Sequence, residues 1–399
     1  MPDPDIVIAG AGIAGLTAAL ALARQGFSVT LLEKRAALDD QGAGIQLSPN
    51  ASRVLLRLGL GGGLGGVARA PSKLEIRRTG DPRSIVEVPL QFIADRHGAP
   101  YWTLLRADLQ QALREALLGE KRVEIMLGVS FKKLSQDSAG VSIEAEDAKG
   151  LPLILTARVF IGADGLWSEA RRALGDASPP RFTGREAWRG MADVSASPDF
   201  LKQPAVFLWL GPSLHCVHYR AGEGGRMNVV LVRAVKAARE GWSSAADKAE
   251  IEPMLASLAK PLAALLGTVP QWQAWPLYDR PADYRVSGRA ALTGDAAHSI
   301  LPFHAQGAAL AIEDAAVLAQ LLKQSGLDAA PAALRAFARL RRARAARVQF
   351  ASRLNGGTYH LGGFAAAARD TVMQKLGPER LAKSYDWLYG WKPPGEGAR

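Results

Sequence analysis

The sequence predicts an α/β fold in which a Rossmann-type nucleotide-binding domain is interleaved with a β-rich second domain and followed by C-terminal helices. An apolar strand, an amphipathic helix and a second strand open the chain over residues 5–32, which is a βαβ unit. Strand-like runs containing Trp and Val fill Arg185–Val232, and the sequence after Ala308 is mostly helical and alanine-rich. Because 399 residues are long for one hydrophobic core, two cooperating domains are expected.

The opening unit is expected to consist of a strand over Asp5–Ala9, a helix over Ile13–Gln25 and a strand over Phe27–Leu32. The elements expected after it are, in chain order, a helix over Ala51–Leu60, a flexible glycine-rich loop over Gly59–Gly66, strand-like alternation over Lys73–Val88, a helix over Arg106–Leu118, two strands within Val123–Glu146, a strand over Arg158–Ala163, a strand over Ala290–Thr293 and a helix over Ala308–Gln324. No internal repeat and no long low-complexity segment interrupts this order.

The composition is ordinary for a soluble enzyme, with 48% hydrophobic and 22% charged residues. No stretch approaches the ~20 apolar residues that a membrane-spanning helix needs. No basic segment precedes the first strand, so a signal peptide is not expected. The single cysteine, Cys216, excludes an internal disulfide and fits a reducing compartment. We therefore expect a cytoplasmic protein without a membrane span.

The formal net charge of +11 is partly concentrated in one basic run. The arginines of this run are Arg335, Arg339, Arg341, Arg342, Arg344 and Arg347. The simplest interpretation is a basic helix with a solvated face. Nucleic-acid binding would require a recognised module or aromatic residues interleaved with the charge, and neither is present, so no nucleic-acid partner is expected. A positive field would instead attract small anionic ligands.

A nucleotide-binding motif joins the first strand to the first helix. It reads Gly10-Ala11-Gly12-Ile13-Ala14-Gly15. Gly10 permits the tight turn, Gly12 lets the backbone approach a pyrophosphate, and Gly15 lets the helix pack closely on the strand. The helix N-terminus offers free N–H groups and a positive dipole end to the phosphates. Glu33, at the end of the second strand, has the spacing of an acid that binds a ribose 2′-hydroxyl.

The same glycine pattern occurs a second time, in residues 61–66. There it follows a helix and not a strand, and no acid closes a βαβ unit behind it. We interpret this second copy as a loop, because the pattern predicts nucleotide binding only in its strand–turn–helix context.

Two later segments make a family resemblance visible. Arg158–Trp167 contains Gly162-Ala163-Asp164-Gly165, and Ala290–Gly307 contains Gly294-Asp295. With the N-terminal glycine motif in front of them, the chain resembles the single-component flavin-dependent aromatic hydroxylases from residue 6 to about residue 391. It is most similar to salicylate hydroxylase-like members. The segments Gly42–Asn50 and Tyr385–Tyr389 of this chain also resemble the sequences of those members.

This resemblance implies a p-hydroxybenzoate hydroxylase-like fold and one non-covalently bound FAD. It implies that Asp295 binds ribityl hydroxyls, that Arg106 pairs with the phosphate and ribityl region, and that Val129 holds the adenine by backbone contacts. The positive end of the helix near Gly307 would face the flavin. The full set of expected FAD-binding residues is Gly10, Gly12, Ala14, Gly15, Glu33, Lys34, Arg106, Val129, Asp164, Asp295, Gly307 and Ala308. No metal site is expected.

Three of the residues in these motifs have a structural alternative. Asp164 is alternatively only a turn residue, and Arg106 is alternatively an ordinary arginine at a helix N-terminus. For His298, within the Gly-Asp segment, a structural role in the turn is at least as well supported as a catalytic one.

The expected domain limits follow the same resemblance. They are residues 1–70, 98–178 and 281–345 for the FAD-binding domain, residues 71–97 and 179–280 for the substrate domain, and residues 346–399 for a C-terminal helical region.

The candidate catalytic residues are His215 and Tyr219, in the sequence His-Cys-Val-His-Tyr. In a strand these two side chains share one face and His218 points to the other. Some family members place a His and a Tyr at this spacing to bind and deprotonate a phenol, and a polar strand face packed on a loop is the alternative. Pro302 and Phe303 match the family position under the flavin edge. His304 stands where an apolar residue is usual, either as a further polar contact to the substrate or as a tolerated change.

The implied activity uses NADH or NADPH to reduce FAD, which then takes up O₂ as a C4a-hydroperoxide and hydroxylates an electron-rich ring. The expected substrate is a phenolic aromatic acid of the salicylate or hydroxybenzoate kind, or a hydroxypyridine carboxylate, and the protein is expected to be a monomer or homodimer. The alternatives are a flavin-dependent halogenase or reductase on the same fold and a non-catalytic flavin-binding protein. A halogenase would carry Trp-x-Trp-x-Ile-Pro, whereas Trp272–Pro276 has the wrong spacing.

Overall fold

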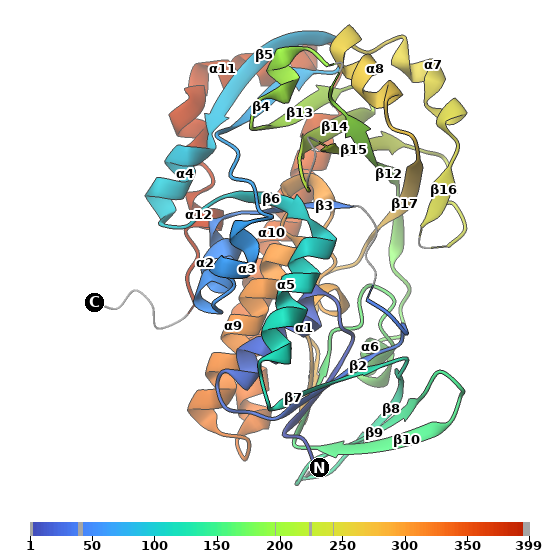
Figure 1. Ribbon diagram of the computed structural model, residues 1–399, viewed down its shortest axis with the longest axis vertical. Coiled ribbons are helices and arrows are strands. Elements are labelled where there is room, and N and C mark those ends of the chain that lie inside the picture. The colour runs from blue at the N-terminus through green and yellow to red at the C-terminus, as the bar shows by residue number, and fades with distance from the viewer. Residues whose placement is uncertain (1–2, 39–42, 196, 223–225, 242, 394–399) are drawn as a thin grey trace.

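The computed structural model describes residues 3–38, 43–195, 197–222, 226–241 and 243–393. Gly42, from the family-like segment Gly42–Asn50, lies outside the described residues. The molecule is elongated, with a six-stranded sheet in its lower half and an eight-stranded sheet in its upper half (Figure 1).

The six-stranded sheet is the predicted nucleotide-binding core. Its strands lie in the order β18 (Val286–Ser287), β19 (Ala290–Leu292), β11 (Val159–Gly162), β1 (Ile6–Ala9), β2 (Val29–Glu33) and β7 (Val123–Leu127). All neighbours are parallel except β18 and β19. Strands β1, β2 and β11 are buried along their whole length, which explains why their sequences are continuous apolar runs. The α/β fold class is confirmed.

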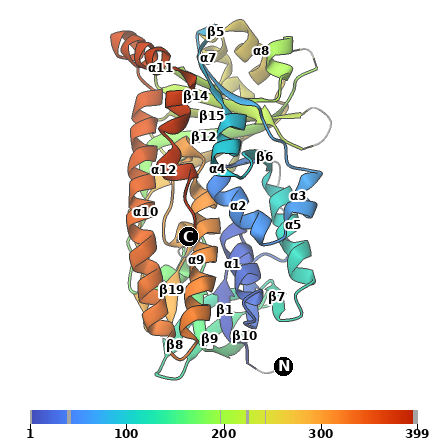
Figure 2. The same ribbon diagram turned by 90° about the vertical axis from the view of Figure 1, so that its left-hand side faces the viewer.

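Helices cover this sheet and connect it to the rest of the chain. The helices of this half are α1 (Ile13–Ala23), α2 (Pro49–Arg57), α3 (Gly61–Gly65), α5 (Arg106–Leu118), α6 (Glu169–Ala173), α9 (Gly307–Ser325) and α10 (Ala330–Tyr359). Helix α9 packs between α1 and α10, and the three run side by side along the long axis (Figure 2). Among the described residues, no helix is both long and apolar enough to cross a membrane.

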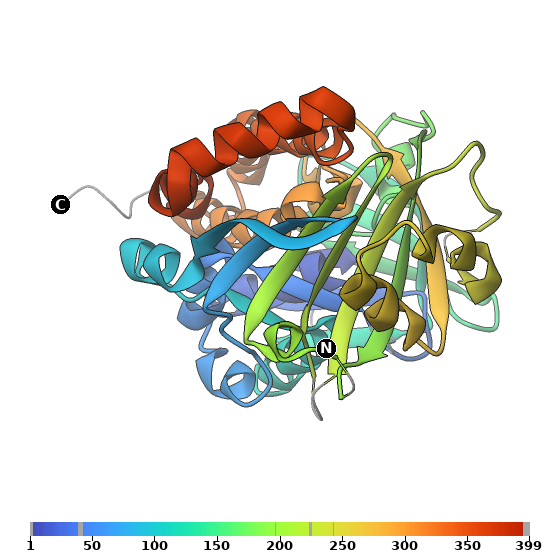
Figure 3. The same ribbon diagram turned by 90° about the horizontal axis from the view of Figure 1, so that it is seen from above.

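The eight-stranded sheet forms the β-rich half. Its strands lie in the order β16 (Ser244–Ala246), β17 (Trp272–Asp279), β12 (Arg181–Asp193), β15 (Arg226–Ala234), β14 (Leu214–Arg220), β13 (Ala205–Gly211), β4 (Lys73–Arg78) and β5 (Asp81–Pro89). One face packs into a core with α8 (Lys260–Gly267), beside α7 (Glu252–Leu255), as the view from above shows (Figure 3). The sole cysteine, Cys216, is fully buried in that core. The opposite face of the sheet therefore looks toward the nucleotide-binding half.

Shorter elements complete the chain. They are the pair β3 (Gly44–Leu47) and β6 (Trp102–Leu105), the sheet β8 (Ser130–Gln136), β9 (Val141–Glu146) and β10 (Pro152–Ala157), the helices α4 (Leu90–His97), α11 (Gly363–Lys383) and α12 (Asp386–Tyr389), and the 3-10 turns η1 (Asp199–Lys202), η2 (Lys248–Glu250), η3 (Gly294–Ala296) and η4 (Pro302–His304).

Two expectations about local structure were wrong. The glycine-rich segment is not a loop, because residues 61–65 form the short helix α3, held by the fully buried Leu64, whose N–H donates to the Leu60 carbonyl at 2.9 Å. Tertiary packing here overrides the low helix propensity of glycine. The segment Val123–Glu146 contains three strands and not two, because Gly128, with φ +71°, turns the chain between β7 and β8.

Two adjacent buried carboxylates on α9 hold the elements together. Asp314 accepts hydrogen bonds from Tyr284 Oη at 2.9 Å, Thr293 Oγ1 at 3.1 Å and Arg341 Nε at 2.6 Å, and lies 2.8 Å from His298 Nε2. Burial alone would raise the pKa of Asp314, but the charges of His298 and Arg341 hold it at about 2. The stabilisation from this group is therefore complete above its ordinary value of 3.8 and is lost as the pH falls toward 2.

Glu313, the neighbour of Asp314, joins α9 to α2 and α10. It accepts from Asn50 Nδ2 of α2 at 2.6 Å and from Arg341 and Arg344 of α10 at 2.7 and 2.6 Å. Arg347 stacks on the Trp387 ring at 4.1 Å. The interpretation of the basic run as a solvated helix face was therefore wrong for Arg341, which is 1% exposed, and for Arg344. The arginines on this side neutralise carboxylates inside the protein.

We expect Arg341→Ala to lower the free energy of unfolding by about 3–5 kcal/mol, because it leaves two buried carboxylates without their shared cation. Arg342→Ala removes the same kind of side chain at the next position, where the arginine is exposed and pairs with Asp283 at 3.2 Å. That variant should change stability by about 0.5 kcal/mol or less. Urea denaturation of both variants measures the difference, and equal effects would contradict the role assigned to Arg341.

Candidate active site

The glycine turn leaves one side open. Gly10 has φ +100°, and a Cβ there would lie 2.5 Å from the Ala163 carbonyl oxygen. A Cβ on Gly15 would lie 1.8 Å from the Gly10 oxygen, so both glycines are required for packing. A Cβ on Gly12 would meet nothing within 4 Å, although Gly12 is the N-cap of α1 and lacks any side-chain cap. The free side of the turn is thus the side from which a pyrophosphate would approach the helix N-terminus.

Glu33 closes the turn from the end of β2. Its carboxylate accepts hydrogen bonds from the Ala11 N–H at 2.9 Å and the Arg35 N–H at 3.0 Å. The Glu33 carbonyl accepts from the Val129 N–H at 2.9 Å, which brings Val129 beside the turn, while Lys34 is exposed. Glu33 therefore ends β2 as expected and fixes the glycine turn, and its ribose-binding role remains a prediction.

The Asp-Gly segment contacts the same turn. The Asp164 Cα would lie 2.9 Å from a Cβ on Gly10. The Asp164 side chain accepts from the Ala170 N–H at 2.9 Å and from Ser168 Oγ, so it binds the N-terminus of α6. Burial raises the pKa of Asp164, while these hydrogen bonds lower it. This geometry supports the alternative in which the Asp164 carboxyl serves its own turn, and its FAD-binding role remains a prediction.

The Gly-Asp segment packs directly on α1. A Cβ on Gly294, which has φ +58°, would lie 2.5 Å from the Ala14 Cβ. Asp295 follows, and its Oδ1 would lie 4.0 Å from a Cβ on Gly307, the first residue of α9. The N-cap of α9, Gln306, makes no side-chain capping bond. The three motifs, far apart in the sequence, thus meet at the N-termini of α1 and α9.

Asp295 lines a hollow in the interior. Burial raises its pKa, against the lowering influence of the charges of His298 and Arg106, yet the residue is exposed. A carboxyl that is surrounded by protein and still accessible lies in a concavity. His298 is fully buried with one ring nitrogen at Asp314, which supports its structural role.

This arrangement fits FAD. The open side of Gly12 and the α1 N-terminus would hold the pyrophosphate, Glu33 the ribose, and Asp295 with Arg106 the ribityl chain. The N–H groups of Gly307 and Ala308 would face the flavin, whose negative charge in the reduced state the helix dipole stabilises. Among the described residues, no cluster of His, Cys, Asp or Glu could hold a metal ion.

Strand β14 presents the candidate catalytic residues as alternation predicted. His218 lies on the opposite face, where its Nε2 accepts from Trp209 Nε1 at 2.8 Å and its ring stacks on Phe207 at 4.7 Å. His215 and Tyr219 face the nucleotide-binding half and are 2% and 3% exposed. Positions four apart on a strand are separated by ~13 Å, so the two side chains would lie on either side of a bound ring.

His215 is a neutral imidazole. Its Nδ1 lies 2.8 Å from His360 Nε2, and its ring contacts Phe303 at 5.4 Å. Burial, together with the charges of His360 and Arg185, holds the pKa of His215 well below its ordinary value. At neutral pH, His215 can therefore accept a hydrogen bond.

Tyr219 keeps its proton. Burial raises its pKa above the ordinary value, against the charge of Arg189. Gln46 also lowers the pKa of Tyr219, and the Tyr101 hydroxyl donates to Gln46 Oε1 at 2.8 Å. Tyr219 is thus a hydrogen-bond donor at neutral pH and not a base.

The segment Pro302–His304 forms η4, and its three residues differ in how deeply they are buried. Phe303 is 4% exposed and packs on Gly356 of α10, where a Cβ would lie 2.7 Å from its ring. His304 is half-buried, 3.4 Å from Asn355 Nδ2 through its Nδ1, and burial lowers its pKa to about 4. Pro302 is half-buried. The substrate contacts predicted for these residues remain predictions, and Phe303 has a packing role in any case.

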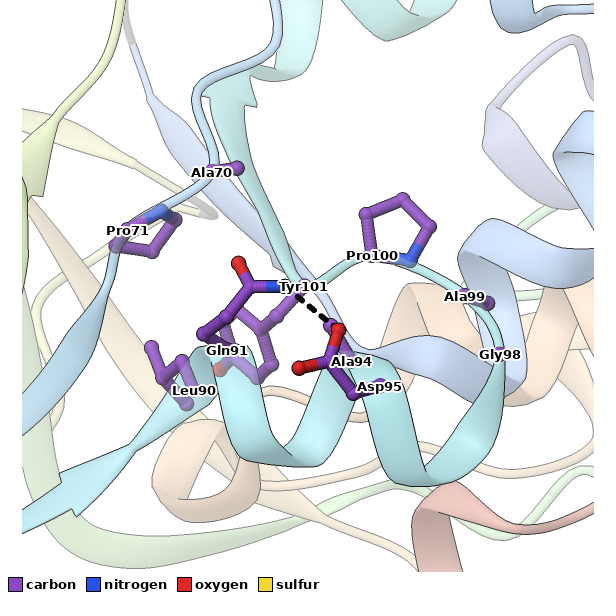
Figure 4. A pocket seen from close by; sticks show the side chains of 10 residues that line it. All are labelled: Ala70, Pro71, Leu90, Gln91, Ala94, Asp95, Gly98, Ala99, Pro100 and Tyr101. Carbon is purple, nitrogen blue, oxygen red and sulfur yellow. Dashed lines mark hydrogen bonds between the residues drawn. The ribbon is translucent and has the colours of Figure 1, made fainter.

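A separate pocket of about 350 Å³ opens at the surface beside α4 (Figure 4). Its lining includes Leu90, Gln91, Asp95 and Tyr101, and Gln91 hydrogen bonds to Asp95 at 2.8 Å. Tyr101 lines this pocket and also hydrogen bonds to Gln46, and none of the residues expected to bind FAD lines the pocket.

Sequence reasoning missed several residues that the fold brings to the site. His360 and Tyr359, at the end of α10, contact His215, and no motif marks them. Gln46 lies inside a family-like segment, which was the only available signal. Arg189 and Asn228 lie on central strands whose pairing the sequence does not reveal.

Comparisons with known proteins agree with this geometry. The family described as "FAD binding domain" matches residues 3–352. A 3-hydroxybenzoate 6-hydroxylase of Polaromonas naphthalenivorans is 33% identical over 395 residues, 98% of this chain and 96% of that protein. A 3-amino-4-hydroxybenzoate 2-monooxygenase of Streptomyces platensis is 36% identical over 401 residues, 99% and 98% of the two chains. A salicylate hydroxylase structure with substrate superimposes with a TM-score of 0.81 at 26% identity, over 98% and 96% of the chains.

Cradle, motifs and relatives together define a flavoprotein monooxygenase. The chain belongs to the FAD-binding-domain family and, within it, to the single-component FAD-dependent aromatic hydroxylases.

We expect Gly12→Val to fold and to lose FAD. Its Cβ meets nothing within 4 Å in the protein but blocks the approach of the pyrophosphate. Gly15→Val is the matched control, and it should fail to fold because its Cβ falls 1.8 Å from a backbone oxygen. Flavin absorbance and circular dichroism distinguish the two outcomes. Full flavin content in the folded Gly12 variant would show that the pyrophosphate lies elsewhere.

Proposed function

We propose that this monooxygenase uses NADH or NADPH and O₂ to hydroxylate a small phenolic aromatic acid, of the hydroxybenzoate, salicylate or hydroxypyridine carboxylate kind. The observation that carries the proposal is the pair His215 and Tyr219, which face the FAD-binding half from one strand. The relatives that act on hydroxybenzoates, at 33% and 36% identity over nearly the whole chain, support the same substrate class.

The chain contributes binding, orientation and the exclusion of water. Bound FAD supplies the redox and oxygen-transfer chemistry. Neutral His215 would accept a hydrogen bond from the phenol, which draws the proton away and raises electron density at the ortho and para carbons. Tyr219, which keeps its proton, would donate to an oxygen of the substrate. Phe303 and the rings around His215 keep water from this side.

The cellular setting and the division of the chain belong to the same proposal. One cysteine, buried in a core, fits a reducing cytoplasm. We infer a monomer or homodimer, and domain limits at residues 70, 97, 178, 280 and 345. The rival functions are a halogenase or reductase on the same fold and a non-catalytic flavin-binding protein.

A substrate panel tests the activity. NADH or NADPH oxidation is measured with hydroxybenzoates and hydroxypyridine carboxylates, and hydroxylated product is quantified beside it. We expect at least one acid to stimulate oxidation with product formed in proportion, whereas the folded Gly12→Val protein, lacking flavin, should be inactive. Product with halogen instead of hydroxyl, or no stimulated oxidation with any acid, would exclude the proposed function.

For the mechanism, Tyr219→Phe should lower ring hydroxylation by on the order of tenfold or more while NAD(P)H oxidation falls less. The difference should appear as H₂O₂, because flavin reduction does not need a positioned phenol. Tyr278→Phe deletes the same oxygen from a tyrosine of β17 that contacts Trp167 and Phe182, and it should leave the coupling unchanged. His218→Ala is not a suitable control although His218 faces away, because this variant also removes a buried hydrogen-bond partner of Trp209. Wild-type coupling in the Tyr219 variant would remove this residue from the mechanism.

A further inference from the structure

The register of the eight-stranded sheet arranges side chains of the inner face in rows. One row pairs Tyr219 of β14 with Asn228 of β15. The next pairs Val217 with Val230, which in turn pairs with Arg189 of β12. The third contains His215 and Val232, which pairs with Ala187. Directly paired residues of antiparallel strands point to the same face, and alternate residues along a strand share it.

The middle row is the accessible one. Tyr219 and Asn228 on one side, and His215 and Val232 on the other, are 3% exposed or less. Val217, Val230 and Arg189 lie between them, in the centre of the sheet, and are only half-buried. Accessible valines on an interior face indicate a gap above them. The gap has an apolar floor, a histidine on one side, a tyrosine on the other and an arginine at one end.

Arg189 is a cation without an anion. Its side chain forms no ion pair or hydrogen bond with any described residue, and its Nε is buried without a partner. Its guanidinium stacks on the Trp275 ring at 4.9 Å. Burial, and then the charge of Arg106, lower its pKa to about 10, so it remains charged at neutral pH. The other arginines buried nearby have partners: Arg233, for example, pairs with Glu186 at 2.7 Å.

A second donor lies one row away. Asn228 is fully buried, and its Oδ1 accepts from the Gly44 N–H at 2.7 Å, which fixes the side chain. Its Nδ2 has no hydrogen-bond partner among the residues that the structure describes. A buried N–H group left unpaired costs ~1–3 kcal/mol, so a ligand acceptor would recover that cost. Val230, next but one along β15, separates this amide from the Arg189 row by ~7 Å.

We propose that Arg189 binds the carboxylate of the aromatic acid, with the ring lying over Val217 and Val230 and the phenol directed at His215 or Tyr219. This assignment rests on the proposed function for its substrate class. A guanidinium can hold a carboxylate through two parallel hydrogen bonds. Two strand spacings, ~10 Å, separate the Arg189 and Val217 backbones, which is room for one aromatic ring between the cation and β14. Arg189 is thus the residue that selects acids over neutral phenols.

Binding, and not turnover, tests this assignment. The FAD-loaded enzyme is titrated with the three hydroxybenzoates and with the matching hydroxybenzamides, and the change in flavin absorbance gives each Kd. We expect Arg189→Gln to weaken the best-bound hydroxybenzoate by about 10- to 100-fold, the loss typical of an unpaired charge-assisted bond. The matching amide should change by less than about twofold. Arg189→Lys should fall between, since it keeps the charge and loses the second hydrogen bond.

Arg226→Gln is the matched control. Arg226 is an exposed arginine on β15, so this variant removes one charge from the same sheet without touching the middle row. It should leave both ligand series unchanged. Equal losses for acid and amide, no loss in Arg189→Gln, or loss of FAD from that variant would each overturn the assignment. If acids bind through Arg189 but no acid is hydroxylated, the assignment of Arg189 stands and the proposed function is excluded. If an acid is hydroxylated equally well with and without Arg189, the proposed function stands and the assignment is excluded.

Discussion

The two neighbouring carboxylates of α9, Glu313 and Asp314, are the constraint on which the site depends. Neither could remain charged in the interior without a cation, and Arg341 serves both. Through Asn50 they fix α2, and through Thr293 and His298 they fix the turn that contains Asp295. The N-terminus of α9 is therefore positioned by ion pairs of two residues that lie about two turns further along the helix.

Close contacts between backbone segments position the motifs together with these charges. At Gly10 and Gly294 a single added carbon would overlap atoms of another motif, and at Gly15 it would overlap the backbone of Gly10 within the glycine motif itself. These contacts hold the glycine turn, the Asp-Gly segment and the Gly-Asp segment at fixed separations. Gly12 is different, because no atom of the described chain lies within 4 Å of a Cβ added there. The packing of the protein itself thus requires Gly10, Gly15 and Gly294, whereas Gly12 keeps the open side at which the sequence motif predicts a pyrophosphate.

The sequence predicted the nucleotide half well because its signals are local. Strand, turn and helix follow one another within residues 6–33, and Glu33 lies within the same unit. Alternation within β14 correctly separated His218 from His215 and Tyr219. Strand pairing could not be predicted in this way, because β12 meets β15 and β17 only in the folded sheet.

Residues whose importance depends on that strand pairing could not be identified from the sequence. Nothing in the sequence distinguishes Arg189 from the other arginines, and only the strand register places it beside Val230. Asn228 becomes a candidate only because the structure shows that Gly44 occupies the oxygen of its side-chain amide. His360 comes from a helix end about 145 residues beyond His215. The interpretation of the basic run was wrong for a related reason. Periodicity locates a helix face, but only the fold shows that carboxylates lie opposite that face.

The row arrangement of the large sheet also bears on how such enzymes diverge. Val217 and Val230 form the floor of the gap but take no part in the hydrogen-bond networks on either side. Exchanges among aliphatic residues at these two positions alter the height of the gap by single methyl groups, while the backbone pairing that orients His215 and Tyr219 is unaffected. Enzymes of this kind can therefore come to accept different ring substituents through single substitutions at these two positions, without first losing activity.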